Sequence, residues 1–188
     1  MKHRLFLAIN IPEELTREIV TLQTRLDKLG LPIRWEDPEK LHLTLNFIGK
    51  VDEEKQSKIE SLAGKIAADS FSFSLTPVFL ETMYKKHETS HVYLGMGGEL
   101  DRLKNLQGLL ASAISEMFIA QPNKYLPHIT IGKLKKMDPV MTKDVLQKIR
   151  EIDIEPLPEF TIDDFSLFES LLSRDGSHYR RVSRYRLS

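Results

Sequence analysis

The stretch "KLHLTLNFIG", residues 40–49, alternates apolar side chains with mostly polar ones. A period of two is typical of a β-strand that has one face in the core and the other face open. His42 and Thr44 then lie side by side on the open face. Such a face usually carries Lys, Glu, Thr or Ser, so a histidine beside a threonine indicates a role other than solvation.

The stretch "YLPHITIGKL", residues 125–134, repeats this pattern with His128 and Thr130. The two histidines are 86 residues apart, and each has its threonine two positions later. One His-x-Thr pair on a strand is weak evidence, because threonine is a good strand former and histidine is often a satisfied polar residue. Two pairs on equivalent open faces are hard to explain as ordinary solvent-exposed strand residues without a function.

The regions around the two motifs have the same order of expected elements, β-α-β-α-β. In the first half we expect strands at 4–10, 42–49 and 71–81 and helices at 13–29 and 52–68. In the second half we expect strands at 91–97, 128–134 and 160–172, helices at 99–118 and 139–150, and a last strand at 179–187. The repetition indicates a duplication, with halves at about 1–88 and 89–188. Related halves commonly pack about an approximate two-fold axis, so both motifs would line one groove.

The composition is that of an ordinary globular protein of 188 residues, with 41% hydrophobic and 29% charged residues. The 27 basic and 27 acidic side chains balance, which argues against a broad surface for long nucleic acids. Cysteine is absent, which excludes disulfides and thiolate chemistry. No apolar run approaches the roughly 20 residues that span a membrane. We expect a cytoplasmic monomer without a membrane partner.

Each His-x-Thr pair presents an imidazole and a hydroxyl to the same small volume, because residues i and i+2 point the same way. Two imidazoles can act as general base and general acid in one turnover. Two hydroxyls can donate hydrogen bonds to anionic oxygens. In-line displacement at a phosphodiester needs all of these groups.

Other chemistries fit the sequence less well. A zinc site needs three or four ligands, and neither an HExxH nor a His-x-His pattern is present. The chain has no G-x-S-x-G elbow, no phosphate-binding P-loop and no G-x-G-x-x-G fingerprint. We therefore expect no metal and no cofactor.

The segments "HLTL" and "HITI" resemble the two H-x-T-x motifs of the two-histidine (2H) phosphoesterases. Within that superfamily the chain is most similar to the RNA 2′,3′-cyclic phosphodiesterases, long named 2′-5′ RNA ligases. The segments "RLFLAINIP", "RWEDPEKLHLTLNFIG", "PHITIGK" and "FSLFESLLSRDGSHYRRVSRYRL" all lie where that family has similar ones. The resemblance thus covers almost the whole chain, in order.

The resemblance implies an α+β fold: a single bilobal domain over residues 1–188, made of duplicated βαβαβ units whose mainly antiparallel sheets face a central groove. It also implies metal-free opening of a 2′,3′-cyclic phosphate at an RNA end to leave a 2′-phosphate. By matching position, His42 is the proton donor and His128 the proton acceptor. Thr44 and Thr130 are the phosphate-binding hydroxyls.

Lys133 departs from the resemblance, because many relatives have arginine three residues after the second threonine. Lysine keeps the charge but loses the bidentate fork. Alternation places Lys133 on the face opposite His128, unless the strand bulges at Gly132. Its role in substrate binding therefore stays open.

Further candidates for substrate binding are Trp35, Phe47 and Tyr125, which flank the motifs. Trp35 and Phe47 could each stack on a base, although alternation favours a core position for Phe47. The segment "SRDGSHYRRVSRYR" has five arginines: Arg174, Arg180, Arg181, Arg184 and Arg186. It could contact an RNA backbone, or it could be a solvated edge strand guarded by charge.

Two alternatives to an RNA-processing phosphodiesterase remain. The substrate could instead be a small cyclic nucleotide or an ADP-ribose cyclic phosphate. The protein could also be a nucleotide-binding module without turnover, although binding alone does not require two proton-transfer groups. The sequence does not decide the physiological substrate, the base preference or the importance of reverse 2′-5′ ligation.

Overall fold

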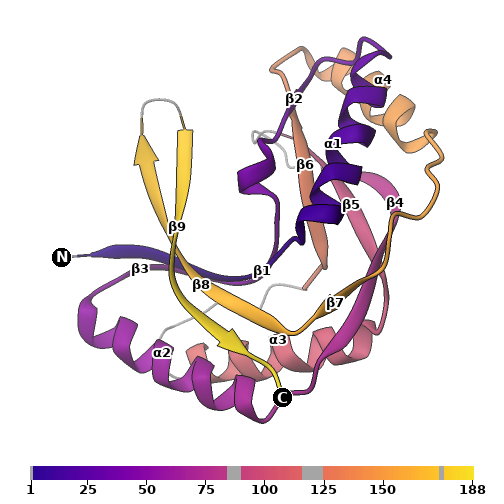
Figure 1. The fold of residues 1–188 in the computed structure, drawn as a ribbon. Helices are drawn as coiled ribbons and strands as arrows, with labels where there is room; N and C mark the ends of the chain where they lie inside the picture. Colours follow the sequence, from indigo (N-terminus) through magenta and orange to yellow (C-terminus); the bar gives the residue numbers. More distant parts are fainter. Residues whose placement is uncertain (1, 84–89, 116–124, 174–175) are drawn as a thin grey trace.

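The computed structural model describes residues 2–83, 90–115, 125–173 and 176–188 (Figure 1). The helices are α1 (Glu13–Asp27), α2 (Glu53–Ala68), α3 (Leu100–Ser115) and α4 (Pro139–Arg150), with a 3₁₀ turn η1 (Pro38–Lys40). The strands are β1 (His3–Asn10), β2 (Ile33–Trp35), β3 (His42–Val51), β4 (Phe73–Met83), β5 (His91–Gly98), β6 (His128–Leu134), β7 (Phe160–Ile162), β8 (Asp164–Ser173) and β9 (Gly176–Arg186).

The strands form one sheet in the order β7-β4-β5-β6-β3-β1-β8-β9, with β2 also paired to β6. Every pair of neighbouring strands is antiparallel. The sheet bends between two arms, and β3 and β6 meet at the centre through the pair Leu43 and Ile129 (Figure 1). The expected α+β bilobal fold with antiparallel strands is confirmed, and its two arms are parts of one bent sheet.

The third strand of each half crosses to the other arm. β4 belongs to the first half but pairs with β5, whereas β8 belongs to the second half but pairs with β1. Asn10 pairs with His42, and Gly95 pairs with His128. The leading strands are therefore related by a shift of 85 residues, one fewer than the shift between the histidines.

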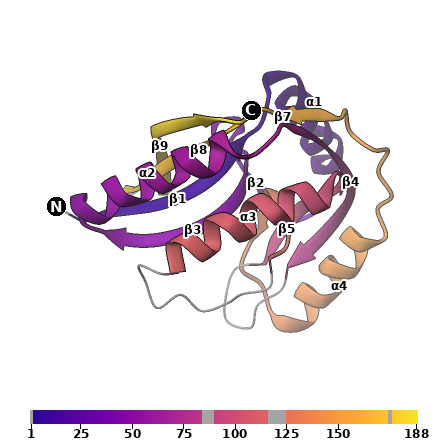
Figure 2. The same cartoon turned by 90° about the horizontal axis from the view of Figure 1, so that it is seen from below.

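The helices cover the side of the sheet away from its hollow. α2 and α3 lie side by side beneath the sheet (Figure 2). α2 buries Ile59, Ala63 and Ala67, and Asp52 caps it by accepting from the Lys55 amide at 3.0 Å, as expected for an N-cap. α1 and α4 pack on the other arm, where Gln23 donates to the Ile131 carbonyl at 2.9 Å. Among the described residues, no helix is long and apolar enough to cross a membrane.

Extra residues in β3 change which side chains face the hollow of the sheet. Leu45 and Ile48 have no partner in the register with β1, so β3 bulges at both positions. Each extra residue moves the following side chains to the other face. Phe47 therefore shares a face with Thr44 and is 77% exposed. The expectation that Phe47 lies in the core is wrong, because it assumed an unbroken alternation.

A similar bulge in β6 decides the position of Lys133. Thr130 pairs with Tyr93 and Lys133 with His91, so β6 has one more residue than β5 between these pairs. Lys133 thus lies on the same face as Thr130, as the sequence allowed if the strand bulged, although the residue without a partner is Ile131 and not Gly132. A Cβ on Gly132 would come within 2.7 Å of the Ile33 side chain, so the approach of β2 requires glycine there.

Candidate active site

The two motifs meet where the arms join. Leu43 and Ile129 are fully buried and point into the core. Their neighbours in each strand therefore point into the hollow of the sheet, where His42 lies opposite Thr130 and His128 opposite Thr44. Antiparallel strands are about 4.8 Å apart, and residues i and i+2 about 6.5–7 Å. The fold thus brings all four side chains of the motifs into one small area.

Both imidazoles are held in the same way. The Nδ1–H of His42 donates to the Lys40 carbonyl at 2.6 Å, and that of His128 donates to the Leu126 carbonyl at 2.8 Å. A carbonyl can only accept, so the proton on Nδ1 is fixed in both rings. The Nε2 atom of each ring remains for a ligand, as an acceptor when the ring is neutral and as a donor when it is cationic.

Aromatic rings surround His42. The ring of Phe6 is 5.2 Å from the imidazole, and the ring of Tyr179 meets it edge-on, also at 5.2 Å. This burial lowers the pKa of His42, and the charges of His128 and Lys133 act in the same direction. The bond to the Lys40 carbonyl and the Glu36 carboxylate oppose the shift but do not cancel it. The protein by itself therefore favours the neutral form of His42.

His128 has a comparable neighbour in the other arm. The ring of Tyr93 meets its imidazole edge-on at 5.2 Å. Tyr93 is buried, and desolvation raises the pKa of its hydroxyl. Each histidine is thus braced by an aromatic ring from the neighbouring strand, Phe6 in β1 or Tyr93 in β5.

The two threonines are half-buried. Within the described ranges, no hydrogen bond is made by either hydroxyl. The backbone carbonyl of Thr44 accepts from the Tyr125 hydroxyl at 3.2 Å. Tyr125 precedes β6, so this bond joins the two arms at the site. Burial holds the pKa of Tyr125 well above its ordinary value of 10, which keeps the phenol a neutral donor.

Lys133 forms an ion pair with Glu36 at 2.9 Å, in the loop that leads to the first motif. The lysine is 30% exposed and the carboxylate 17% exposed, so the pair is partly desolvated. Glu36 was not predicted as a site residue, because nothing in its sequence neighbourhood marks it as the partner of a lysine 97 residues away. The pair places one positive and one negative charge within electrostatic reach of His42.

Trp35 and Phe47 lie in different settings. The Trp35 indole donates to the Asp27 carboxylate at 2.9 Å, and its ring packs on the core beside Gly132. Phe47 extends a group of rings that also contains Phe6, Phe168 and Tyr179, with Phe6 at the centre. Phe6 and Tyr179 were not predicted as site residues. Their strands bear no motif, and only the strand pairing brings them to His42.

Two arginines of the arginine-rich strand β9 form ion pairs within the protein. Arg180 makes two hydrogen bonds to Glu169, and Arg184 makes two to Asp164. Glu169 also accepts from His3 at 2.6 Å. Arg174 lies outside the described residues. These ion pairs indicate a structural role in the edge strand β9 for Arg180 and Arg184. They do not account for Arg181.

Among the described residues, no three His, Cys, Asp or Glu side chains gather in a way that could hold a metal ion. The polar groups that face the junction of the arms are instead imidazoles, hydroxyls and one lysine–glutamate pair. A bent sheet of antiparallel strands, with a His-x-Thr pair on each of its two central strands, is the arrangement that the resemblance to the two-histidine phosphoesterases implies.

The chain belongs to the LigT-like phosphoesterase family, whose model matches residues 9–80 and 95–179. The expected family is thus confirmed. The chain is 33% identical to the RNA 2′,3′-cyclic phosphodiesterase of Thermotoga maritima over 180 residues, which are 94% of this chain and 91% of that protein. It is 27% identical to the Escherichia coli protein of the same name, with 98% of this chain and 97% of that protein covered.

The fold is shared with solved structures. The crystal structure of E. coli LigT in apo form matches with a TM-score of 0.79 and 25% identity, covering 100% of this chain and 98% of that one. LigT complexed with 3′-AMP matches with a TM-score of 0.79 and 26% identity, covering 100% and 99%. The similarity spans both arms, so it includes the junction that carries the motifs.

Proposed function

We propose that this protein hydrolyses 2′,3′-cyclic phosphate ends of RNA to 2′-phosphates by metal-free acid–base catalysis. One observation carries the proposal. The two imidazoles are fixed by the same Nδ1–carbonyl bond on adjacent strands, which leaves both Nε2 atoms for proton transfer. The name shared by the relatives from T. maritima and E. coli supplies the substrate.

The reaction divides between the two histidines. His128 Nε2 takes a proton from water, and the resulting hydroxide attacks phosphorus. The bond from phosphorus to the 3′-oxygen breaks, and His42 Nε2 gives its proton to that oxygen. The products are a 2′-phosphate and a free 3′-hydroxyl, and exchange with solvent returns both rings to their starting states. The assignment of acid and base follows the family resemblance.

The charge of the bound substrate favours the protonated form of His42, which is the form that a general acid needs. Burial lowers the pKa of His42, so the protein by itself favours the neutral ring. The negative charge of a bound phosphodiester favours the imidazolium. The acid is therefore formed on binding, and Glu36 assists because its carboxylate acts in the same direction. The hydroxyls of Thr44 and Thr130 donate to the two non-bridging oxygens.

Phe47 and Lys133 are proposed substrate contacts at the edges of the site. The exposed ring of Phe47 offers a face for a nucleobase, and Phe6 packs beside it with ring centroids 6.1 Å apart. Stacking of this kind tolerates any base. Lys133 supplies positive charge near the phosphate while Glu36 fixes its position. Trp35 and Tyr125 support the site through their hydrogen bonds to Asp27 and to Thr44.

The experiment is the incubation of the protein with an RNA ending in a 2′,3′-cyclic phosphate, in excess EDTA. Mass spectrometry of the product should show the gain of one water, and nuclease mapping should place the phosphate on the 2′-oxygen. His42→Ala and His128→Ala are the matched negative controls. A product with a 3′-phosphate, or turnover that requires an added metal, would contradict the proposal.

Small cyclic nucleotides are the competing substrate class. The structure of LigT complexed with 3′-AMP shows that a relative of 26% identity accepts a mononucleotide. A comparison of kcat/KM between a 2′,3′-cyclic mononucleotide and a cyclic-phosphate oligonucleotide decides between the classes. An oligonucleotide preference supports RNA ends, and a mononucleotide preference supports the alternative.

A further inference from the structure

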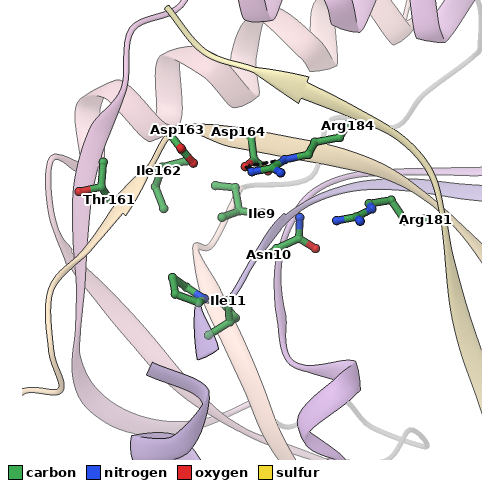
Figure 3. A pocket seen from close by; sticks show the side chains of 10 residues that line it. Ile9, Asn10, Ile11, Thr161, Ile162, Asp163, Asp164, Arg181 and Arg184 are labelled. Carbon is green, nitrogen blue, oxygen red and sulfur yellow. Dashed lines mark hydrogen bonds and ion pairs between the residues drawn. The ribbon is translucent and has the colours of Figure 1, made fainter. Parts of the chain in front are cut away.

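A polar pocket of about 380 Å³ opens beside the proposed active site, at the end of β1 (Figure 3). It is lined by Asn10, the strand partner of His42, and by Arg181 and Arg184 of β9. Asp163 lies at the far side of the pocket (Figure 3). The pocket contains neither histidine, so the proposed reaction does not use it.

The arginines of β9 are not equivalent. Arg180 pairs in register with Glu169, and Arg181 pairs with Phe168. Neighbouring residues of a strand point to opposite faces. Arg180 therefore lies on the face away from the hollow, where it binds Glu169. Arg181 shares the face of Phe168, whose ring stacks on Phe6.

The charges in the pocket leave one guanidinium available. Arg184 is neutralised by the Asp164 carboxylate, to which it donates two hydrogen bonds. Arg181 is exposed, and in the described part of the chain no carboxylate binds it. Figure 3 shows its side chain extending towards Asn10. The Asn10 amide donates one hydrogen to the Ser166 hydroxyl at 3.1 Å, and its second hydrogen remains.

The strand register relates Arg181 to β3, the strand that carries the first motif. Phe47, Phe6, Phe168 and Arg181 form one row across β3, β1, β8 and β9. Three strand spacings separate the ends of the row by about 14 Å between Cα atoms. The curvature of the sheet and the length of an arginine side chain both shorten the gap to a phosphate held between the histidines. Asn10 lines the pocket together with Arg181 and is also the strand partner of His42, so the pocket begins next to the first motif.

We infer that Arg181 and Asn10 bind the phosphodiester that precedes the terminal nucleotide of an RNA substrate. The inference rests on the proposed function and specifies its substrate as an oligonucleotide with at least one internal phosphate. Asp163 at the opposite end disfavours a second phosphate there, and its carboxylate can accept from a ribose hydroxyl. The pocket would thus hold one phosphate at its Arg181 end.

The test compares three 2′,3′-cyclic substrates: a mononucleotide, a dinucleotide, and the same dinucleotide with a neutral methylphosphonate link. Arg181→Gln should lower kcat/KM for the ordinary dinucleotide about five- to tenfold, because one charge-assisted hydrogen bond is lost at an exposed site. It should change the other two substrates less than about twofold. The control Arg180→Gln removes the same charge one residue away, on the other face, and should affect all three substrates equally.

Binding of a dinucleotide that already carries a 2′-phosphate separates failure of the inference from failure of the proposed function, because it needs no turnover. Arg181→Gln should weaken that binding and reduce its salt slope by about one. Equal losses on the mononucleotide and the dinucleotide would overturn the inference. The inference would also be overturned if the wild type preferred the methylphosphonate dinucleotide over the mononucleotide as strongly as it prefers the ordinary dinucleotide. The internal charge would then have no role.

Discussion

Replacement of Thr44 by valine tests whether its hydroxyl binds phosphate. Valine keeps the β-branch and the shape, and the hydroxyl makes no hydrogen bond within the described residues, so folding loses little. The expected loss is that of one hydrogen bond to a charged oxygen, about 1.5–3 kcal/mol in transition-state stabilisation. This corresponds to roughly a ten- to hundredfold fall in kcat/KM.

The assay follows the opening of a 2′,3′-cyclic phosphate under single-turnover conditions. Thr76→Val is the matched control, because Thr76 is also a half-buried strand threonine and lies in β4, where it pairs with Gly97. We expect Thr76→Val to retain activity within about twofold of the wild type. Thr44→Val and Thr76→Val should both melt within a few degrees of the wild type. Undiminished kcat/KM in Thr44→Val and in Thr130→Val would refute the argument and leave the threonines as strand formers.

Three further predictions concern the surroundings of His42. Glu36→Gln removes a carboxylate that raises the pKa of His42, so the limb of the pH–rate profile that belongs to the acid should move to lower pH; a shift to higher pH contradicts this. The pKa of His42 lies below its ordinary value of 6.5, so the unfolded chain takes up a proton before the folded one, and the stability of the fold should decrease as the pH drops below about 6.5. His42→Gln should make this decrease smaller, and the same pH dependence of stability in the variant and the wild type counts against a buried neutral ring. Phe47→Ala should raise KM for nucleotide substrates by roughly five- to hundredfold if the ring stacks on a base, with Phe71→Ala as the control for an exposed phenylalanine.

Much of the fold follows from local patterns in the sequence. The helices and strands around both motifs lie close to their expected bounds, because their apolar side chains follow a clear period of two or of about 3.6 residues. The short strand β2 was not predicted. It has three residues, and its pairing with β6 depends on the missing side chain of Gly132. The exchange of β4 and β8 between arms was not predictable either, since it is decided by long-range pairing.

The candidate site was predictable where residue types and alternation sufficed. His42, Thr44, His128 and Thr130 face the hollow together, as expected. Phe47 was misplaced because one extra residue in a strand reverses every later side chain, and the sequence gives no local sign of a bulge. Apart from Glu36 and the Lys40 carbonyl, which are close to His42 in the sequence, the rings and charges that act on the pKa of His42 come from strands far away along the chain, so only the folded arrangement reveals them.

The division of labour between the histidines is tested most directly with a phosphodiester that has a nitrophenolate leaving group. A good leaving group departs without a proton, so removal of the general acid matters little, whereas the base is still needed to activate water. His42→Ala should regain most of its lost rate on this substrate, and His128→Ala should stay inactive. Rescue of His128→Ala alone would reverse the roles, and full activity of either variant on a natural 2′,3′-cyclic phosphate would contradict catalysis by the pair.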